Sequence, residues 1–116
     1  MLNYIMSWTI TFYNERVRAA LLKWPETLKA KLARILELIK EQGGNIGMPL
    51  TRAMGDGLFE IRVKGKDGIG RVFFAYIRQQ EIVILHSFIK KQQETPQKEL
   101  QTAKQRLSEI KSVENT

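Results

Sequence analysis

Hydrophobic positions in the first half of the chain recur three or four residues apart, which is the spacing of one face of an α-helix. Apolar residues follow this spacing from Val17 to Trp24 and again from Leu28 to Ile39. Asn14 is suited to cap the first helix, Pro25 separates the two helices, and Gly43-Gly44 ends the second. These features predict a helical hairpin.

Other segments show the patterns of β-strands. Apolar and polar residues alternate in Trp8–Phe12 and in Leu58–Lys64, and Arg71–Arg78 is rich in aromatic and β-branched residues. Ile82–Ile89 is almost continuously apolar, which predicts a central strand covered on both faces. Short turns join the last three segments, Gly65-Lys66-Asp67-Gly68 among them, so these segments are predicted to form an antiparallel meander.

The remaining segments complete an α+β fold. Residues 43–57 contain five glycines and one proline and are predicted to form a loop that presents Arg52. In the last helix we expect Thr95 to be the cap and Pro96 to occupy the first position. The predicted order is β-α-α-β-β-β-α, with the helical hairpin and the C-terminal helix packed on an antiparallel sheet.

The composition indicates a single folded domain. With 116 residues, 43% of them hydrophobic and 27% charged, the chain is long enough and apolar enough to build one core. We expect one domain over residues 1–116, with residues 1–6 and 112–116 frayed. No stretch approaches the roughly 18 apolar residues of a membrane span. The N-terminus lacks the features of a signal peptide, so we expect a cytoplasmic protein without membrane contact.

The residue types present exclude several kinds of chemistry. Cysteine is absent and His86 is the single histidine, which excludes disulfides, thiol nucleophiles, cysteine-based zinc sites and multi-histidine metal sites within one chain. Glycine-rich nucleotide-binding motifs and paired strand carboxylates are not found either. In contrast, 19 Lys and Arg residues against 12 Asp and Glu residues give a net charge of +7. This balance indicates a polyanionic partner, most simply nucleic acid, or else a solvated basic surface.

Strand alternation gathers basic side chains on one face of the predicted sheet. Glu60, Arg62 and Lys64 share the face opposite the apolar residues of their strand. Arg71 is expected opposite or diagonal to Arg62 and Lys64, and the last strand carries His86, Phe88 and Lys90 on one face. Because like charges on one face repel one another unless an anion lies among them, this face is predicted to bind phosphate.

The same residues also allow a purely structural interpretation. In this alternative, Arg62 pairs with Glu60 or Glu81 and the lysines contact only water. His86 is either an acid/base group, a ring that stacks on a nucleic-acid base, or a histidine of the core. Phe88 either belongs to the core or stacks on a base.

Several short motifs follow one another between residues 58 and 106. They are Leu58-Phe59-Glu60-Ile61-Arg62, Arg71-Val72-Phe73-Phe74, Leu85-His86-Ser87-Phe88-Ile89-Lys90-Lys91 and Glu94-Thr95-Pro96, then Glu99, Ala103 and Arg106. Their order and spacing in a basic chain of this length resemble the RelE/ParE toxin superfamily, and most closely its HigB-type branch of phage-derived proteins. The N-terminal strand and the helical hairpin fit the same layout.

This resemblance implies the toxin of a type II toxin–antitoxin system. Members of the RelE and HigB groups are ribosome-dependent endoribonucleases that cut mRNA through attack of a ribose 2′-hydroxyl on the adjacent phosphate, without a metal or another cofactor. The implied partners are the ribosome, mRNA and a helix-turn-helix antitoxin of the HigA type, through which alone the toxin reaches operator DNA. The alternative within the superfamily is a ParE-like inhibitor of DNA gyrase that is no enzyme.

The implied reaction assigns roles to the basic face. It needs a base, positive charge on the phosphorane and an acid for the leaving 5′-oxygen. Arg62 and Arg71 are suited to hold the phosphate, and His86 and Lys90 complete the predicted catalytic set. RNA binding is expected of Arg52, Lys64, Lys91 and Phe88. Related enzymes often carry a functional tyrosine near the C-terminus, and no tyrosine follows Tyr76 here, so acid catalysis either falls to His86, a lysine or an arginine, or is absent.

Overall fold

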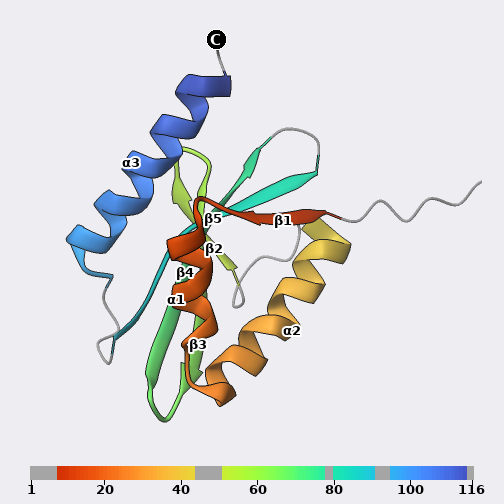
Figure 1. Cartoon of the computed structure of the whole chain (residues 1–116), viewed down its shortest axis with the longest axis vertical. Helices are drawn as coiled ribbons and strands as arrows, with labels where there is room; N and C mark the ends of the chain where they lie inside the picture. Colours follow the sequence, from red (N-terminus) through yellow and green to blue (C-terminus); the bar gives the residue numbers. More distant parts are fainter. Residues whose placement is uncertain (1–7, 44–50, 78–79, 91–94, 115–116) are drawn as a thin grey trace, which may run out of the picture.

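The computed structural model has a mixed α+β fold with a five-stranded sheet and three helices (Figure 1). It describes residues 8–43, 51–77, 80–90 and 95–114. The elements in chain order are β1 (Thr9–Phe12), α1 (Glu15–Leu22), α2 (Glu26–Gln42), β2 (Thr51–Gly55), β3 (Leu58–Gly65), β4 (Gly68–Ile77), β5 (Glu81–Lys90) and α3 (Gln97–Glu114). The predicted α+β class and the three helices are thereby confirmed.

The sheet differs from the prediction in the direction of one strand. The strand order is β1-β5-β4-β3-β2, and β1 runs parallel to β5, with Thr9 opposite Glu81 and Phe12 opposite Ile84. The expectation of a purely antiparallel sheet is therefore wrong. Parallel strands require a long crossover, and here the connection between β1 and β5 contains the whole helical hairpin and three strands.

A strand also replaces part of the predicted glycine-rich loop. Residues 51–55 form β2, which pairs antiparallel with β3. Asp56 and Gly57 make the connecting turn with φ angles of 56° and 84°, the left-handed values that an Asp-Gly pair supplies in tight hairpins. Arg52 therefore lies on an edge strand rather than in a loop, and the predicted order lacked this strand.

The helix ends follow the sequence signals at one terminus and depart from them at another. Asn14 caps α1 as expected, because its Oδ1 accepts a hydrogen bond from the Val17 amide at 2.9 Å. In α3, the carbonyl of Pro96 accepts from the Leu100 amide at 3.2 Å, so the helix begins one residue later than predicted. Thr95, the predicted cap, lies two residues before the first residue of the helix. At its other end α3 continues to Glu114, past the point where fraying was expected.

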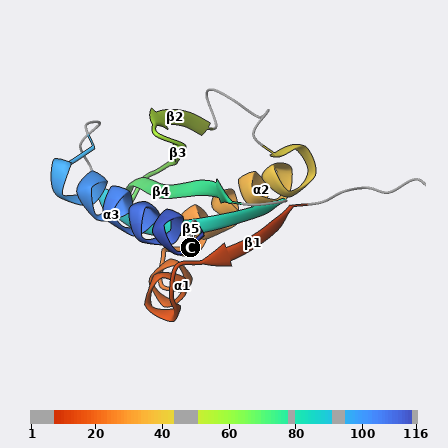
Figure 2. The same ribbon diagram turned by 90° about the horizontal axis from the view of Figure 1, so that it is seen from above.

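Two apolar clusters lie on opposite faces of the sheet. The helical hairpin covers one face, where residues of α1 and α2 pack on Ile61, Val72 and Ile84. Helix α3 covers part of the other face, where Ala103 and Leu107 pack on residues such as Phe73 and Leu85 (Figure 2). Strand β5 is therefore covered on both sides over Ile82–Leu85, as its apolar run predicted, whereas residues 86–90 are partly or fully exposed and depart from that prediction. None of the helices within the described residues is long and apolar enough to cross a membrane.

An extra residue in β5 changes which side chains reach the face under α3. Phe73 pairs with His86, whereas the next residue of β4 pairs with Ile84, so Leu85 bulges out of the ladder. Without this bulge, strict alternation would place His86 beside Ile84, against the helical hairpin. The carbonyl oxygen of Leu85 accepts a hydrogen bond from Arg106 Nη1 at 2.6 Å, which joins the bulge to α3.

Close packing of α1 and α2 on the sheet depends on a glycine in β4. A Cβ atom at Gly70 would lie 2.7 Å from two ring carbons of Trp24, which is buried. We expect Gly70→Ala to lower the free energy of unfolding by about 1–3 kcal/mol, as overpacking of a filled core does. Urea denaturation measures this loss. The same replacement in a Trp24→Leu background should cost clearly less, and an equal loss in both backgrounds would contradict the steric explanation.

Candidate active site

Pairing of the strands places the predicted site residues in three cross-strand rows on the face that α3 partly covers. The rows, read from β2 or β3 to β5, are Arg52/Glu60/Phe73/His86, Arg62/Arg71/Phe88 and Lys64/Ile69/Lys90. Residues directly opposite one another share a face, and alternate residues along a strand do too. Seven of the eight predicted residues therefore lie on one face of the sheet. The eighth, Lys91, lies outside the described residues.

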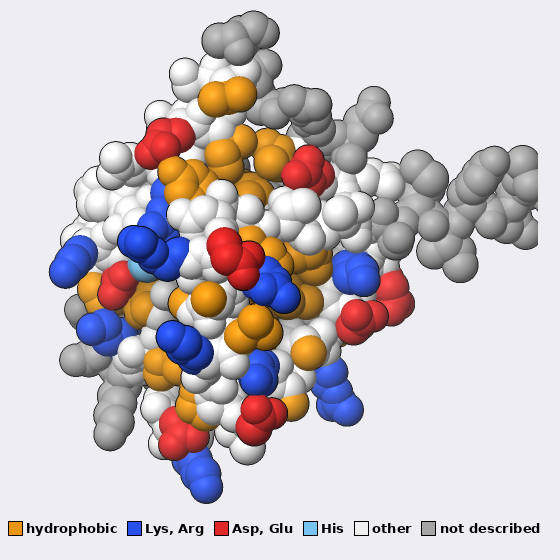
Figure 3. Space-filling model, in the orientation of Figure 1, with side chains coloured by type: hydrophobic (Ala, Val, Ile, Leu, Met, Phe, Trp, Pro, Cys, Tyr) orange, Lys and Arg blue, Asp and Glu red, His pale blue; other side chains and the backbone are white. Residues whose placement is uncertain are grey.

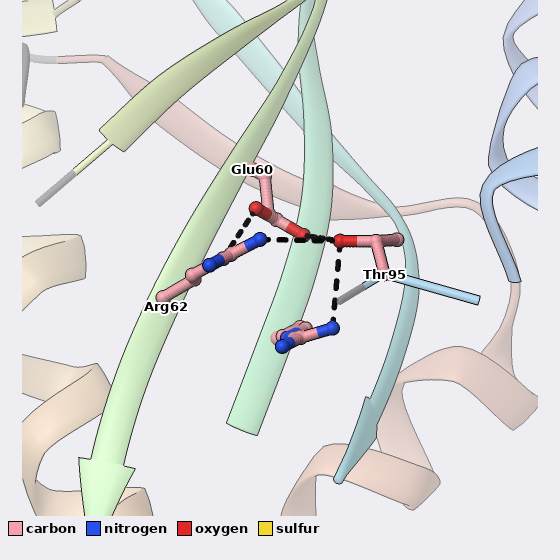
Figure 4. Close-up of polar contacts among 4 residues, drawn as sticks. Glu60, Arg62 and Thr95 are labelled. Carbon is pink, nitrogen blue, oxygen red and sulfur yellow. Dashed lines mark hydrogen bonds and ion pairs between the residues drawn. The ribbon is translucent and has the colours of Figure 1, made fainter. Parts of the chain in front are cut away.

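A buried carboxylate lies among the arginines. The Glu60 side chain is 0% exposed, and its Oε1 accepts a hydrogen bond from Arg62 Nε at 2.8 Å (Figure 4). Its Oε2 accepts from the Thr95 hydroxyl at 2.9 Å. That hydroxyl oxygen in turn lies 3.4 Å from Arg62 Nη2 and 3.4 Å from Arg71 Nη1. The anion beside the arginines is thus the Glu60 carboxylate of the chain itself. This is the Arg62–Glu60 pair that the structural interpretation of the sequence predicted.

The two arginines differ in their access to solvent. Arg71 is 0% exposed, whereas the Arg62 side chain retains 24% exposure beside its partner carboxylate. Burial lowers the pKa of Arg71 from its ordinary value, and repulsion from Arg62 and Arg52 lowers it further, while Glu60 opposes the shift. A guanidinium stays charged even so. Because Arg71 is enclosed and Arg62 is partly exposed, Arg62 is the arginine of this pair that an external phosphate can reach.

The histidine is held by an acid from α3. His86 Nε2 lies 2.6 Å from Glu99 Oε1, and both side chains are 20% exposed. A carboxylate only accepts hydrogen bonds, so Nε2 carries a hydrogen in either protonation state and Nδ1 is the atom that can exchange a proton. Glu99 is the third residue of α3, where the helix dipole favours a negative charge.

The other predicted residues surround this centre. Arg52, Lys64 and Lys90 are exposed, on β2, β3 and β5 respectively. The Phe88 ring is partly buried, with the Arg71 guanidinium 5.8 Å and the His86 ring 5.9 Å from its centroid. Basic side chains elsewhere are spread among acidic ones, as the face in Figure 3 shows, so the net charge alone does not locate a site.

Three members of the cluster were not assigned to the site from the sequence. From the sequence, Glu60 is only a structural partner of Arg62, Thr95 is a helix cap, and Glu99 is part of a family pattern. The signal available for Glu60 is its position two residues before Arg62 on the same face of one strand. The contacts of Thr95 and Glu99 depend on the position of α3, which sequence spacing does not provide.

The arrangement combines an anion-binding group with groups that transfer protons. Arg62 offers a partly exposed guanidinium, His86 offers an oriented imidazole, and Lys64 and Lys90 add exposed positive charge. Within the described ranges, no three His, Cys, Asp or Glu side chains come together in a way that would hold a metal ion. These are the components that acid/base chemistry at a phosphate requires.

The fold matches that of a solved toxin. A structure of E. coli toxin RelE, an arginine double mutant in the free state, superposes with a TM-score of 0.55 at 14% sequence identity. The match covers 71% of this chain and 82% of that chain. The protein therefore has a RelE-like fold, as the motif pattern predicted. No curated protein matches the chain.

The sequence itself defines the family. The family described as Phage derived protein Gp49-like (DUF891) matches residues 19–108, which is most of the chain. The chain belongs to this Gp49-like family of phage-derived proteins. The family and the fold together confirm the predicted resemblance to RelE-like toxins, whereas assignment to the HigB branch stays a prediction.

Proposed function

We propose that this protein is the toxin of a type II toxin–antitoxin system and acts as a ribosome-dependent endoribonuclease on mRNA in the cytoplasm. The observation that carries the proposal is an oriented histidine, His86, on the same sheet face as a partly exposed arginine, Arg62, which lies in the neighbouring cross-strand row. Its partners are the ribosome with bound mRNA and a HigA-like helix-turn-helix antitoxin, which mediates contact with operator DNA. Membership of the Gp49-like family and the RelE-like fold support this proposal.

The proposed reaction is an in-line displacement at one phosphate. The 2′-oxygen of the preceding ribose forms a bond to phosphorus as the bond to the 5′-oxygen breaks, leaving a 2′,3′-cyclic phosphate and a 5′-hydroxyl. The phosphate lies on the Arg62 guanidinium, which stabilises the charge that develops on the phosphorane. Glu60 and Thr95 fix that guanidinium from the buried side of the cluster, and Arg71 contacts the same Thr95 hydroxyl.

Two groups on β5 lie on either side of the phosphate. His86 and Lys90 are four residues apart, about 13 Å along a strand, with the row of Arg62 between them. Neutral His86 takes the proton of the 2′-hydroxyl through Nδ1, and the Lys90 ammonium donates a proton to the leaving 5′-oxygen. Arg52, Lys64 and Lys91 bind neighbouring phosphates, and Phe88 offers a partly exposed ring for stacking.

Induced expression in a bacterial host, with mapping of new 5′ ends in cellular mRNA within minutes, tests this function. We expect cuts within translated frames for the wild type and for Lys40→Ala, a basic residue outside the site. Arg62→Lys should reduce them about tenfold, because lysine keeps the charge that Glu60 pairs with but loses the bidentate geometry. Growth arrest with intact mRNA would contradict the nuclease and direct attention to DNA gyrase. Growth without arrest would contradict a toxin.

A further inference from the structure

A pocket opens beside the proposed active site, between α2 and the end of β3. Its volume is about 360 Å³, within the range of roughly 300–1,000 Å³ typical of ligand sites. Its apolar lining consists of Leu38, which is partly exposed, and of Ile35 and Val63, which are almost fully buried. Arg62 lines this pocket and also belongs to the arginine cluster, so one residue is common to the two sites.

The remaining lining residues are all basic. Lys31 and Arg34 come from α2 and Lys64 from β3, and each is exposed. Lys31 Nζ donates a hydrogen bond to the Lys64 carbonyl at 2.7 Å, which keeps this cation at the junction of helix and strand. Among the described residues, no carboxylate lies within ion-pair distance of these three side chains. The pocket thus combines apolar walls with an uncompensated positive rim.

We propose that this pocket binds the nucleotide of the RNA next to the scissile phosphate and acts as a specificity subsite; this inference rests on the proposed function. A nucleotide has the matching chemistry, since its flat base can contact aliphatic walls while its phosphate binds basic side chains. The shared Arg62 and the basic rim favour RNA over a protein segment, because successive phosphates of one strand supply the negative charge that both sites lack.

Methyl NMR on the wild-type protein tests the ligand without requiring cleavage. The probe is a 2′-O-methyl trinucleotide, which lacks the attacking hydroxyl, and its control is an abasic trinucleotide of the same charge. We expect saturable shifts of the Ile35, Leu38 and Val63 methyl signals with the first probe and much smaller shifts with the abasic control. Equal shifts with both probes, or none at all, would overturn the inference.

Matched charge reversals locate the binding. The double variant Lys31→Glu/Arg34→Glu should bind the trinucleotide at least about tenfold more weakly and with a shallower salt dependence. Lys40→Glu reverses a charge on the other flank of α2 and should change the affinity less than about twofold. If the double variant instead loses antitoxin binding and keeps its affinity for RNA, the pocket is a protein-docking surface and the inference fails.

Cleavage assays on purified ribosomes with the same proteins separate this inference from the proposed function. Wild-type cleavage with a changed codon profile in the double variant supports both. Wild-type cleavage without methyl shifts overturns only the subsite. Base-dependent shifts without any wild-type cleavage overturn the nuclease and with it the place of this pocket beside a scissile bond.

Discussion

Glu60→Ala is expected to lower the free energy of unfolding by about 3–5 kcal/mol, the cost of breaking a buried charge pair by removal of one partner. The Glu60 carboxylate is fully buried and holds Arg62 directly and the Thr95 hydroxyl through its second oxygen. Its loss leaves the buried Arg71 guanidinium beside Arg62 with no carboxylate from this position to offset their repulsion. Urea denaturation followed by circular dichroism measures the change.

A surface carboxylate provides the control for this prediction. Glu15 pairs with Arg18 at 2.8 Å, but both side chains are largely exposed, so Glu15→Ala should cost less than about 1 kcal/mol. Glu60→Gln retains the shape and one acceptor oxygen and should fall between the two variants. A loss below about 1 kcal/mol for Glu60→Ala would mean that the arginines find other anions and that this carboxylate does not hold the cluster.

His86→Ala is expected to lower the rate of mRNA cleavage on ribosomes by about 10²–10⁴-fold, the usual contribution of a general acid or base. Under the proposed mechanism the imidazole takes the proton of the attacking hydroxyl. Glu99 fixes the ring through Nε2, which leaves Nδ1 to accept that proton. Single-turnover cleavage of a defined mRNA with the toxin in excess isolates the chemical step from binding.

Glu99→Gln separates orientation from proton transfer. The amide can still contact the ring but need not select the same tautomer, so we expect a smaller loss than for His86→Ala and an altered pH profile of the rate. Both variants should unfold cooperatively and bind the antitoxin with wild-type affinity. If His86→Ala cleaves at a normal rate, the histidine is a structural partner of α3 and a lysine transfers the proton.

The parts of the fold that the sequence predicts well depend on local rules. The helical hairpin follows from apolar spacing and from the Asn14 cap, and the meander follows from alternation and a glycine turn. Strand β2 was missed because glycine content outweighed a usable signal, the Asp56-Gly57 pair of a tight hairpin. The direction of β1 has no local signal, since its partner β5 lies some 70 residues away in the chain.

The candidate site also has features that local rules predict and features that they do not. Alternation alone places Glu60, Arg62 and Lys64 on one face, and the register then brings Arg71 directly opposite Arg62. Alternation does not predict the burial of Glu60 and Arg71, because that burial depends on how α3 and Thr95 cover the sheet. The sequence therefore predicts which side chains meet but not that one arginine is enclosed while its neighbour stays accessible.

The bulge at Leu85 has a consequence for comparing this protein with its relatives. On its N-terminal side, odd-numbered residues of β5 face α3, and beyond it even-numbered residues do, His86 and Lys90 included. An alignment carried through this strand without a gap, against a relative that lacks the bulge, would match core residues with site residues over half its length. Residue equivalence at the candidate active site must therefore be established from strand pairing, with any gap placed at Leu85.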